Sequence, residues 1–537
     1  MLRAASVFGE VCWDGAVTAL VGRAMSSAAV TEWFGKLVEQ EVLAERPGSR
    51  FAGQREFMFR HALLREGAYA TLTDHDRRLG HQLAGEWLVQ HDEGDPMVLA
   101  GHFERGGDGA RAASYYLGAA EQAFHILDLE ATMTRAALGL GCVPPHELRI
   151  ALLGLRCEAS CQGLQMIGAV MPEAEELIRA ARQGTIPWGQ AMIAYIEGTM
   201  LAGRIPDLLA AIGSLGAVRP TPDAIGRVAL VFLAAVCILD ALGQVREATA
   251  LEAHFLAVVR TVGSDEPLAR FWWNILVGMR ASYAHGDPWN GLLHSNAIQP
   301  IFEITGGERT YLNMELFRGL NLWYLGALGP ASTTLAAIAA ADDSLGVASS
   351  LRRFGLAWLL ADRGELPAAH QVAAELAEHG RAHRNVLDEG RGRWVLAEVL
   401  RRLGRHGEAE TALDAALALA VPLERPGVLG TLAALRLTQG RVDDAVDAAT
   451  EAVATITAIG ACGGFRGAFV HLVQAEALYA SGAHDAARRA IGDARRQLHT
   501  IADLIADPGY RASFLEAVPE NARTLELAAA WLGDTVS

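Results

Sequence analysis

One short phrase returns four times between Leu359 and Arg495, and it constrains the fold of this chain more than any other feature. The copies read LLADRGELPAAHQVA, VLRRLGRHGEAETAL, LRLTQGRVDDAVDAA and ALYASGAHDAARRAI. In each copy an apolar helical run ends in a glycine, a short polar turn follows, and an alanine lies near the start of the next apolar run. This pattern predicts a repeated pair of antiparallel helices.

The glycine and the alanine each have a physical reason. Glycine suits the residue after a helix end, where the backbone adopts a positive φ, and alanine lets two antiparallel helices approach closely. The turn glycines are Gly364, Gly404, Gly440 and Gly482. The alanines five residues later are Ala369, Ala409, Ala445 and Ala487. Paired helices that cannot bury an apolar face alone must stack on their neighbours, so the sequence predicts a solenoid.

The same register extends towards the N-terminus. It continues at Gly326, Gly286, Gly243 and Gly203, and the eight glycines lie 36 to 43 residues apart. The alanine step also holds at Ala248 and Ala331 but fails at Leu208 and Gly291. The repeat resembles the tetratricopeptide repeat, although its mean period of about 40 is longer than the usual 34. We therefore expect an all-α, tetratricopeptide-like right-handed superhelix, an α-solenoid, of roughly eight or nine helix pairs.

Composition limits the possible partners and compartments. The chain has 537 residues, 51% of them hydrophobic, and a net charge of −16. Such an acidic balance argues against a protein that mainly neutralises phosphates. The most apolar run, Val228 to Leu239, has 12 residues and is too short to span a bilayer. With no signal peptide in the first residues, we expect a cytoplasmic protein.

The cysteines are scattered through apolar runs. We therefore expect them to be reduced residues of the hydrophobic core. They are Cys12, Cys142, Cys157, Cys161, Cys237 and Cys462. Cys157 and Cys161 share a helix face, so a metal pair is an alternative there; buried small hydrophobic residues are the commoner outcome.

The N-terminal 90 residues differ from the repeats. Two helical patterns are followed by VLAERPGSRFAGQREFMFRH, in which a Pro47–Gly48 turn separates two short runs with strand character. This predicts a β-hairpin. Helices followed by a hairpin indicate a small winged-helix-like domain. We expect this domain over residues 1–90, a helical connector over 91–140, the repeat solenoid over 141–500 and C-terminal capping helices over 501–537.

Three further stretches carry a resemblance to a known family. They are FRHALLREGAYATL at 59–72 with the RLGH that follows at 78–81, the opening LRAASVFGEVCW, and YRASFLEAVPENARTLELAAAWLG at 510–533. Together they resemble the C-terminal half of bacterial STAND-type signalling ATPases, including multidomain serine/threonine protein kinases with such an ATPase. The resemblance covers essentially the whole chain. It implies a winged helix and a repeat solenoid for signal transduction, attached to an ATPase and often to a kinase.

The catalytic motifs of that family are missing from this chain. A P-loop needs G-x-x-x-x-G-K-[ST], because its lysine reaches the phosphates. The one lysine, Lys36, lies in WFGKLVEQ with Leu37 in place of Ser or Thr. The H-R-D and D-F-G motifs of kinases are absent from the sequence as well. We expect no ATP binding, no catalytic residue and no cofactor. Because Met1 lies inside the family-like stretch, we expect either an upstream reading frame that encodes the ATPase or kinase module, or a longer frame that continues through Met1.

Two alternatives remain open. The chain is part of an ATP-dependent kinase or STAND ATPase whose catalytic domains lie elsewhere, or it is a winged-helix transcriptional regulator. Residues 1–90 hold 10 Lys and Arg against 11 Asp and Glu, and the candidate recognition helix TEWFGKLVEQEVL carries three glutamates. The carboxylates of these glutamates would repel the phosphates of nucleic acid, so nucleic acid is an unfavoured partner. The favoured interpretation is that residues 1–90 form a packing module.

Metal chemistry has little support in the sequence. His146-Glu147 begins like H-E-x-x-H, but Ile150 occupies the place of the second histidine. His379 and His383, with two nearby glutamates, share a helix face and are possible metal ligands. A solvated linker between repeats is the favoured interpretation, and we expect no metal.

The concave wall of the solenoid is the surface for which the sequence suggests a function. In tetratricopeptide repeats the first helix of each pair lines a groove that binds a peptide or protein partner. The resemblance implies these groove residues: Trp273, Arg280, Tyr283, Asn313, Trp323, Phe354, Trp358, Arg391, Trp394, Glu398 and Arg401. Aromatic residues and arginines dominate binding hot spots.

The alternative is that the tryptophans fill gaps between helices. The arginines predict a positive patch that favours carboxylate-bearing partners. If so, Arg391→Ala with Arg401→Ala abolishes partner capture and leaves the melting temperature nearly unchanged.

Overall fold

The computed structural model describes residues 1–126, 128–162, 167–262, 266–305, 308–338, 347–383, 385–461 and 467–533. The chain divides into two compact units, Met1–Ser160 and Cys161–Ser537. Each unit has its own hydrophobic clusters. Cys462 lies outside the described residues.

The first unit begins with a small antiparallel sheet packed against helices. In chain order the elements are α1 Leu2–Ser6, β1 Val11–Trp13, α2 Asp14–Val21, η1 Gly22–Ala24, α3 Ser27–Glu39, β2 Leu43–Glu45 and β3 Glu56–Phe59. The strand order is β1-β3-β2. Phe34 of α3 stacks on Phe57 of β3 with ring centroids 4.2 Å apart, and both side chains are fully buried. The predicted β-hairpin is therefore present as β2 and β3, paired antiparallel.

Helices in succession complete the first unit. They are α4 Ala62–Ala70, α5 Asp74–Gln90, α6 Pro96–Gly106, α7 Gly109–His125, α8 Leu129–Gly141 and α9 His146–Gln162, within which the division falls. Side-chain oxygens of Thr73, Asp95, Asp108 and Asp128 accept hydrogen bonds from backbone N–H groups in the first turns of α5 to α8. Such N-caps begin helices because the first N–H groups lack partners within the helix.

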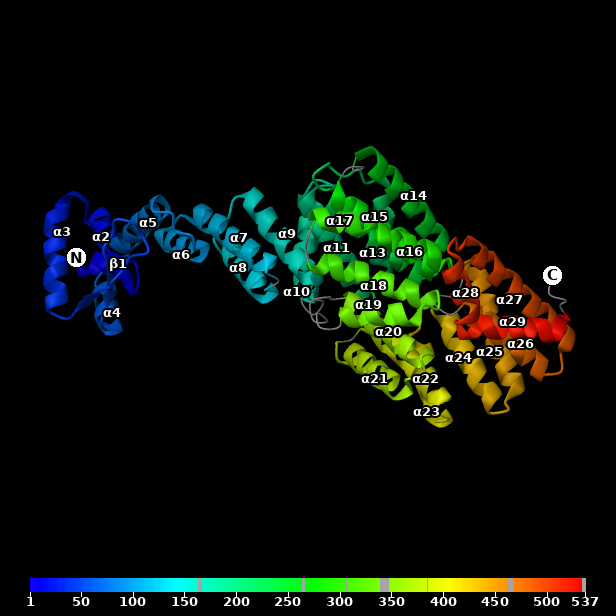
Figure 1. Ribbon diagram of the computed structural model, residues 1–537. Coiled ribbons are helices and arrows are strands. Elements are labelled where there is room, and N and C mark those ends of the chain that lie inside the picture. Colours follow the sequence, from blue (N-terminus) through cyan, green and yellow to red (C-terminus); the bar gives the residue numbers. More distant parts are fainter. Residues whose placement is uncertain are drawn as a thin grey trace. The chain divides into compact units, whose positions relative to one another are not determined.

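The second unit consists of helices that pack mainly on their neighbours in the chain (Figure 1). They are α10 Ile167–Ala180, α11 Ile186–Leu201, α12 Ile205–Ser214, η3 Leu215–Ala217, α13 Ile225–Ala241, α14 Val245–Val262, α15 Pro267–Tyr283, α16 Pro288–Ala297, α17 Gln299–Thr305, α18 Glu308–Tyr324, α19 Leu328–Ala337, α20 Val347–Asp362, α21 Leu366–Ala382, α22 Val386–Arg402, α23 His406–Leu419, α24 Arg425–Thr438, α25 Val442–Ile459, α26 Gly467–Ala480, α27 His484–Leu504, α28 Pro508–Glu516 and α29 Pro519–Leu532. This unit is an all-α solenoid, as the repeats predict.

The structure confirms the reason for the repeated glycine. All eight turn glycines have φ between 67° and 81°, a conformation that residues with a Cβ rarely adopt. The alanines five residues later are fully buried between paired helices. At Gly291, where the alanine is missing, a Cβ would overlap Ser282 Oγ and Asn321 Oδ1. At Gly291 the neighbouring helices therefore lie even closer together than at the positions occupied by alanine.

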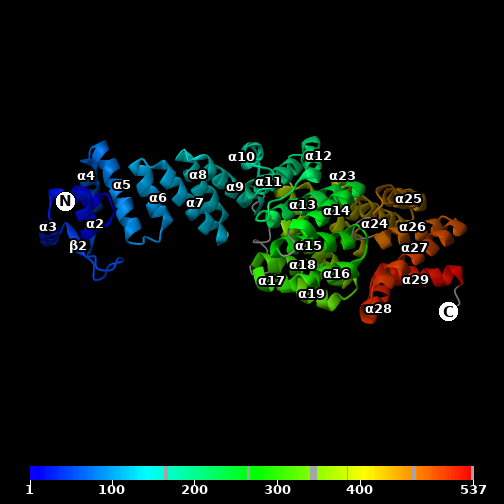
Figure 2. The same ribbon diagram turned by 90° about the horizontal axis from the view of Figure 1, so that it is seen from above.

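Later segments of the solenoid pack against the turns of the middle repeats. The backbone N–H of Leu423 donates to Ala241 O at 3.3 Å, and a Cβ added at Gly326 would lie 2.6 Å from Ser513 O. Val245, Tyr283, Leu423 and Ala461 form one buried cluster across these segments. The chain of repeats thus curls back on itself within this unit (Figure 2).

Among the described residues, none of the helices combines the length and hydropathy that crossing a membrane requires.

Candidate functional site

The curled repeats border a partly open cavity of about 600 Å³. One side is formed by residues at the ends of α15, α18 and α20 and in the turns that follow α15 and α18. The other side is formed by α25 to α29, so the walls come from segments far apart in the sequence. The lining residues used below are Ser282, His285, Trp323, Asp362, His471, Leu498, Ile501, Phe514, Ala517, Glu520, Asn521 and Thr524.

The cavity wall is largely apolar, with a few polar groups. Trp323, Leu498 and Phe514 are buried side chains that contribute apolar surface. Asp362 is held in place, because its carboxylate accepts from Trp323 Nε1 at 2.9 Å and pairs with Arg402 at 3.0 Å. Ligand sites commonly combine apolar walls with a small number of fixed polar groups.

Two acidic residues line the cavity. Asp362 and Glu520 carry carboxylates, and the described lining residues include neither arginine nor lysine. Burial lowers the pKa of both His285 and His471, which favours the neutral form of these imidazoles.

The side-chain oxygen of Asn521 is buried and accepts no hydrogen bond from the described residues. The Asn521 side chain is 2% exposed, and its Nδ2 donates to Phe514 O at 2.9 Å. A buried acceptor without a donor costs about 1–3 kcal/mol. Among the described residues, none donates a hydrogen bond to Asn521 Oδ1.

A second hollow of about 530 Å³ shares four lining residues with this cavity. The shared residues are Thr457, His471, Gln497 and Thr500. This hollow also includes Asp493 and Arg496, which form an ion pair on α27. Its wall is more polar than that of the first cavity.

The predicted groove residues lie mostly inside the solenoid. Arg280 is 2% exposed; its Nε donates to Asp240 at 2.7 Å, and the same guanidinium pairs with Glu252. Trp358 and Trp394 are fully buried, with ring centroids 5.5 Å apart. These positions match the alternative in which the tryptophans fill gaps between helices.

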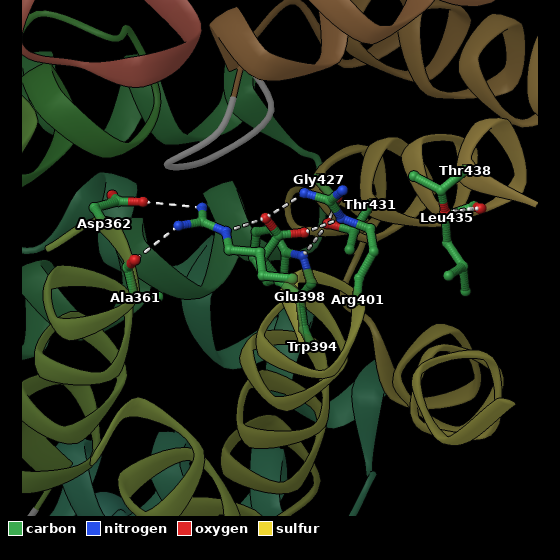
Figure 3. A network of polar contacts seen from close by, with 10 residues as sticks. Ala361, Asp362, Trp394, Glu398, Arg401, Gly427, Thr431, Leu435 and Thr438 are labelled. Atoms are coloured by element: carbon green, nitrogen blue, oxygen red, sulfur yellow. Dashed lines mark hydrogen bonds and ion pairs between the residues drawn. The ribbon is translucent and has the colours of Figure 1, made fainter. Parts of the chain in front are cut away.

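The arginines of the predicted positive patch face carboxylates. Arg391 Nε donates to Glu424 at 2.7 Å. Glu398, which is 1% exposed, accepts from Arg401 Nε at 2.8 Å and from Arg402 Nε at 2.7 Å (Figure 3). Arg402 continues to Asp362, so this network reaches the cavity wall. Because each arginine is compensated internally, little positive charge is left for a partner.

The remaining groove residues differ in their surroundings. Tyr283 is buried and donates to Glu424, whereas Trp273 packs half-buried beside Phe255 and Asn313 is half-buried. Phe354 is fully buried. Trp323 alone of the predicted set lines the cavity in the described structure.

Sequence reasoning missed the C-terminal wall of the cavity. Asn521 and Thr524 of α29 are buried polar residues in a segment predicted only as capping helices. The signal in the sequence that could have identified these two residues is their position on the buried side of an amphipathic helix. Nothing in the local pattern indicates which distant repeat they face.

The described residues contain no group of three or more His, Cys, Asp or Glu side chains that could hold a metal ion. His379 and His383 lie with ring centroids 4.3 Å apart, and His383 Nδ1 lies 2.9 Å from the backbone oxygen of His379.

Comparisons with known proteins give only distant similarities. No family model matches the chain, and no curated protein matches it. A solved Rap protein complexed with competence and sporulation factor has 13% identity and a TM-score of 0.44, covering 64% of this chain and 98% of its own. The APC/C hetero-tetramer Cut9–Hcn1 has 14% identity and a TM-score of 0.44, covering 88% and 96%.

A STAND protein with a tetratricopeptide repeat sensor from Pyrococcus horikoshii is also similar to this chain. It has 11% identity and a TM-score of 0.33, covering 98% of this chain and 63% of its own. The solenoid fold itself follows from the helix pairs described above.

Proposed function

We propose that this chain is a non-catalytic binding module whose solenoid takes up a peptide or protein segment. The observation that carries the proposal is the cavity of about 600 Å³ between the repeat turns and the C-terminal helices. Its volume falls within the roughly 300–1,000 Å³ typical of ligand sites, and its apolar walls with few polar groups fit such a site. In the parent architecture that the sequence resembles, binding would control an attached ATPase or kinase.

The hydroxyl groups of the cavity support binding over catalysis. A nucleophilic hydroxyl needs a base within hydrogen-bond reach. Ser282 Oγ instead donates to Asn321, and Thr524 Oγ1 donates to the backbone oxygen of Glu520 at 2.7 Å. These hydroxyls serve the packing of helices.

The predicted groove residues take two roles in this proposal. Trp323 contacts the ligand, because it lines the cavity. The others hold the helices that shape the wall, and the pair of Arg402 with Asp362 connects one of their networks to it. The N-terminal 90 residues act as a winged-helix-like packing module, since their net charge is unsuited to DNA.

Selection of a displayed random-peptide library on the full chain tests this function. Ala517 is exposed and lines the cavity, whereas Ala529 is exposed on α29 away from it. We expect enriched peptides to bind Ala517→Trp about tenfold more weakly, and Ala529→Trp as tightly as the original chain. Absence of any enriched peptide, or equal binding by both variants, would contradict the proposal.

A further inference from the structure

We propose that the cavity and the polar hollow beside it bind one extended peptide segment, which places a bulky apolar side chain in the cavity and presents main-chain amide groups to the hollow. This inference rests on the proposed function and adds the way in which the segment is recognised. The apolar residue is selected by its side chain. The residues next to it are recognised through their main chain, so their side chains are free to vary.

The two hollows adjoin along a wall formed by three consecutive helices. Four residues line both of them: Thr457 of α25, His471 of α26, and Gln497 and Thr500 of α27. Helix α26 packs against both α25 and α27, so the shared residues lie on neighbouring helices. A ligand that contacts these shared residues therefore touches both hollows.

The apolar and the polar residues of this region differ in exposure. Trp323, Leu498 and Phe514 line only the cavity and are buried. Gln497 and Thr500, which line both hollows, are exposed. An apolar side chain gains free energy when it leaves water for the cavity, whereas polar groups lose little when they stay at the exposed wall. This division favours a ligand with one apolar part and one polar part.

The polar hollow offers hydrogen-bonding groups that the described residues leave unused. The side-chain amides of Gln474 and Gln497 make no hydrogen bond with any described residue. The hydroxyl groups of Thr457 and Thr500 donate to backbone oxygens of their own helices, each at 2.9 Å, so their oxygens keep the capacity to accept. An amide side chain carries both donors and an acceptor. The hollow therefore suits a ligand that also offers both.

The main chain of an extended peptide presents such groups at every residue. Each residue other than proline carries one N–H donor and one C=O acceptor, and an extended segment leaves them available to a partner. The ligand groups are uncharged, and so are the two glutamine side chains. The ion pair of Asp493 with Arg496 balances its own charges. Main-chain groups are the same for most residue types, so recognition here depends little on sequence.

Peptides enriched from a displayed library of random dodecapeptides on the full chain are the probes. We expect the enriched peptides to share one bulky apolar residue. Serine in its place should weaken binding at least about tenfold, whereas alanine at the neighbouring positions should change binding less than about twofold. Methylation of one main-chain nitrogen at a time removes one N–H. Calorimetry should identify at least one N–H whose removal weakens binding about five- to tenfold.

Two protein variants connect that N–H to the polar hollow. Gln474→Ala and Gln497→Ala should each weaken binding of the original peptide about fivefold. For at least one of them, the N-methylated peptide should show no further loss, because the variant has already removed the partner of the missing N–H. Gln371→Ala on α21, which lines neither hollow, is the matched control and should bind as tightly as the original chain. Melting curves from circular dichroism check that all three variants are folded.

The outcomes separate this inference from the proposed function. The inference is overturned if the enriched peptides share no apolar residue or tolerate serine in its place. It is also overturned if no N-methylation weakens binding, if both glutamine variants bind as tightly as the original chain, or if neither variant is coupled to any N–H. In each of these cases the proposed function stands as long as Ala517→Trp weakens binding. If no peptide is enriched, the proposed function fails, and this inference fails with it.

Discussion

Tyr283 and Glu424, which are 141 positions apart, meet in a buried hydrogen bond in which the tyrosine hydroxyl donates to the carboxylate. Arg391 donates to the same carboxylate, its Nε lying 2.7 Å from Glu424 Oε1. Glu424 is 3% exposed. Burial and the neighbouring carboxylate raise the pKa of Tyr283, so this side chain stays neutral. The three side chains connect α15 and α22 to the residue that precedes α24, and so hold the curled solenoid together.

Arg391→Ala should destabilise the protein strongly. The substitution leaves Glu424 buried without its cation, and breaking a buried pair costs about 3–5 kcal/mol. Tyr283→Phe removes one hydrogen bond to the charge and should cost about 1.5–3 kcal/mol. Chemical denaturation monitored by tryptophan fluorescence measures both. Arg405→Ala, which removes an exposed pair with Glu408, serves as the control and should leave the midpoint unchanged.

This prediction replaces the expectation from sequence that Arg391→Ala with Arg401→Ala leaves the melting temperature nearly unchanged. An unchanged midpoint for the double variant would show that these buried pairs contribute nothing to stability.

Gly291→Ala should lower stability by about 1–3 kcal/mol through overpacking. The new methyl group would overlap Ser282 Oγ and Asn321 Oδ1. Gly329→Ala in α19 is the matched control, because the added methyl group meets no atom within 4 Å. Differential scanning calorimetry should show a lower melting temperature for the first variant only. Equal melting temperatures would argue against the close approach of helices at Gly291.

The first unit should lose stability on acidification below about pH 6.5. Burial lowers the pKa of His81 to about 3 and that of His102 to about 4, and their Nδ1 atoms lie 3.1 Å apart. Both folded-state pKa values lie below the unfolded value. As the pH falls, the unfolded chain therefore binds protons that the folded chain does not, and stability decreases by up to about 1.4 kcal/mol per pH unit for each histidine.

Urea denaturation between pH 7 and pH 4.5 measures this slope. His102→Gln should reduce the slope, and His75→Gln, at an exposed position, should not. A slope that is the same in all three proteins would exclude the buried histidines as its cause.

The chain should not bind ATP. Lys36, the one lysine, lies on α3 in an exposed pair with Glu32 at 2.7 Å and is not part of a phosphate-binding loop. Titration with a fluorescent ATP analogue, with and without Mg²⁺, should give no saturable signal up to about 100 μM, a concentration that detects any complex tighter than about −5.5 kcal/mol. Micromolar binding that Lys36→Ala removes would show a nucleotide site instead.

The sequence by itself determined the helix pairs. Turn glycines such as Gly364 need positive φ, and alanines such as Ala369 leave room for one close neighbour. Both requirements act between residues near each other in the chain, so they leave a periodic pattern that can be read without a structure. The β-hairpin at residues 43–59 was predictable for the same reason, because alternation and a turn are local signals.

Only the tertiary structure decided how the solenoid closes and where its cavity lies. Each repeat is rotated slightly relative to the one before, and these rotations add up over many repeats. Whether distant residues such as Tyr283 and Glu424 meet therefore depends on all the repeats between them, and no pattern in the sequence around either residue predicts the contact. The same holds for Arg391. A charged residue is ordinarily expected at the surface, and it becomes an interior residue only because a distant carboxylate arrives to neutralise it. Asn521 belongs to the cavity wall for the same reason, since the curl of the repeats brings α29 opposite the turns of the middle repeats.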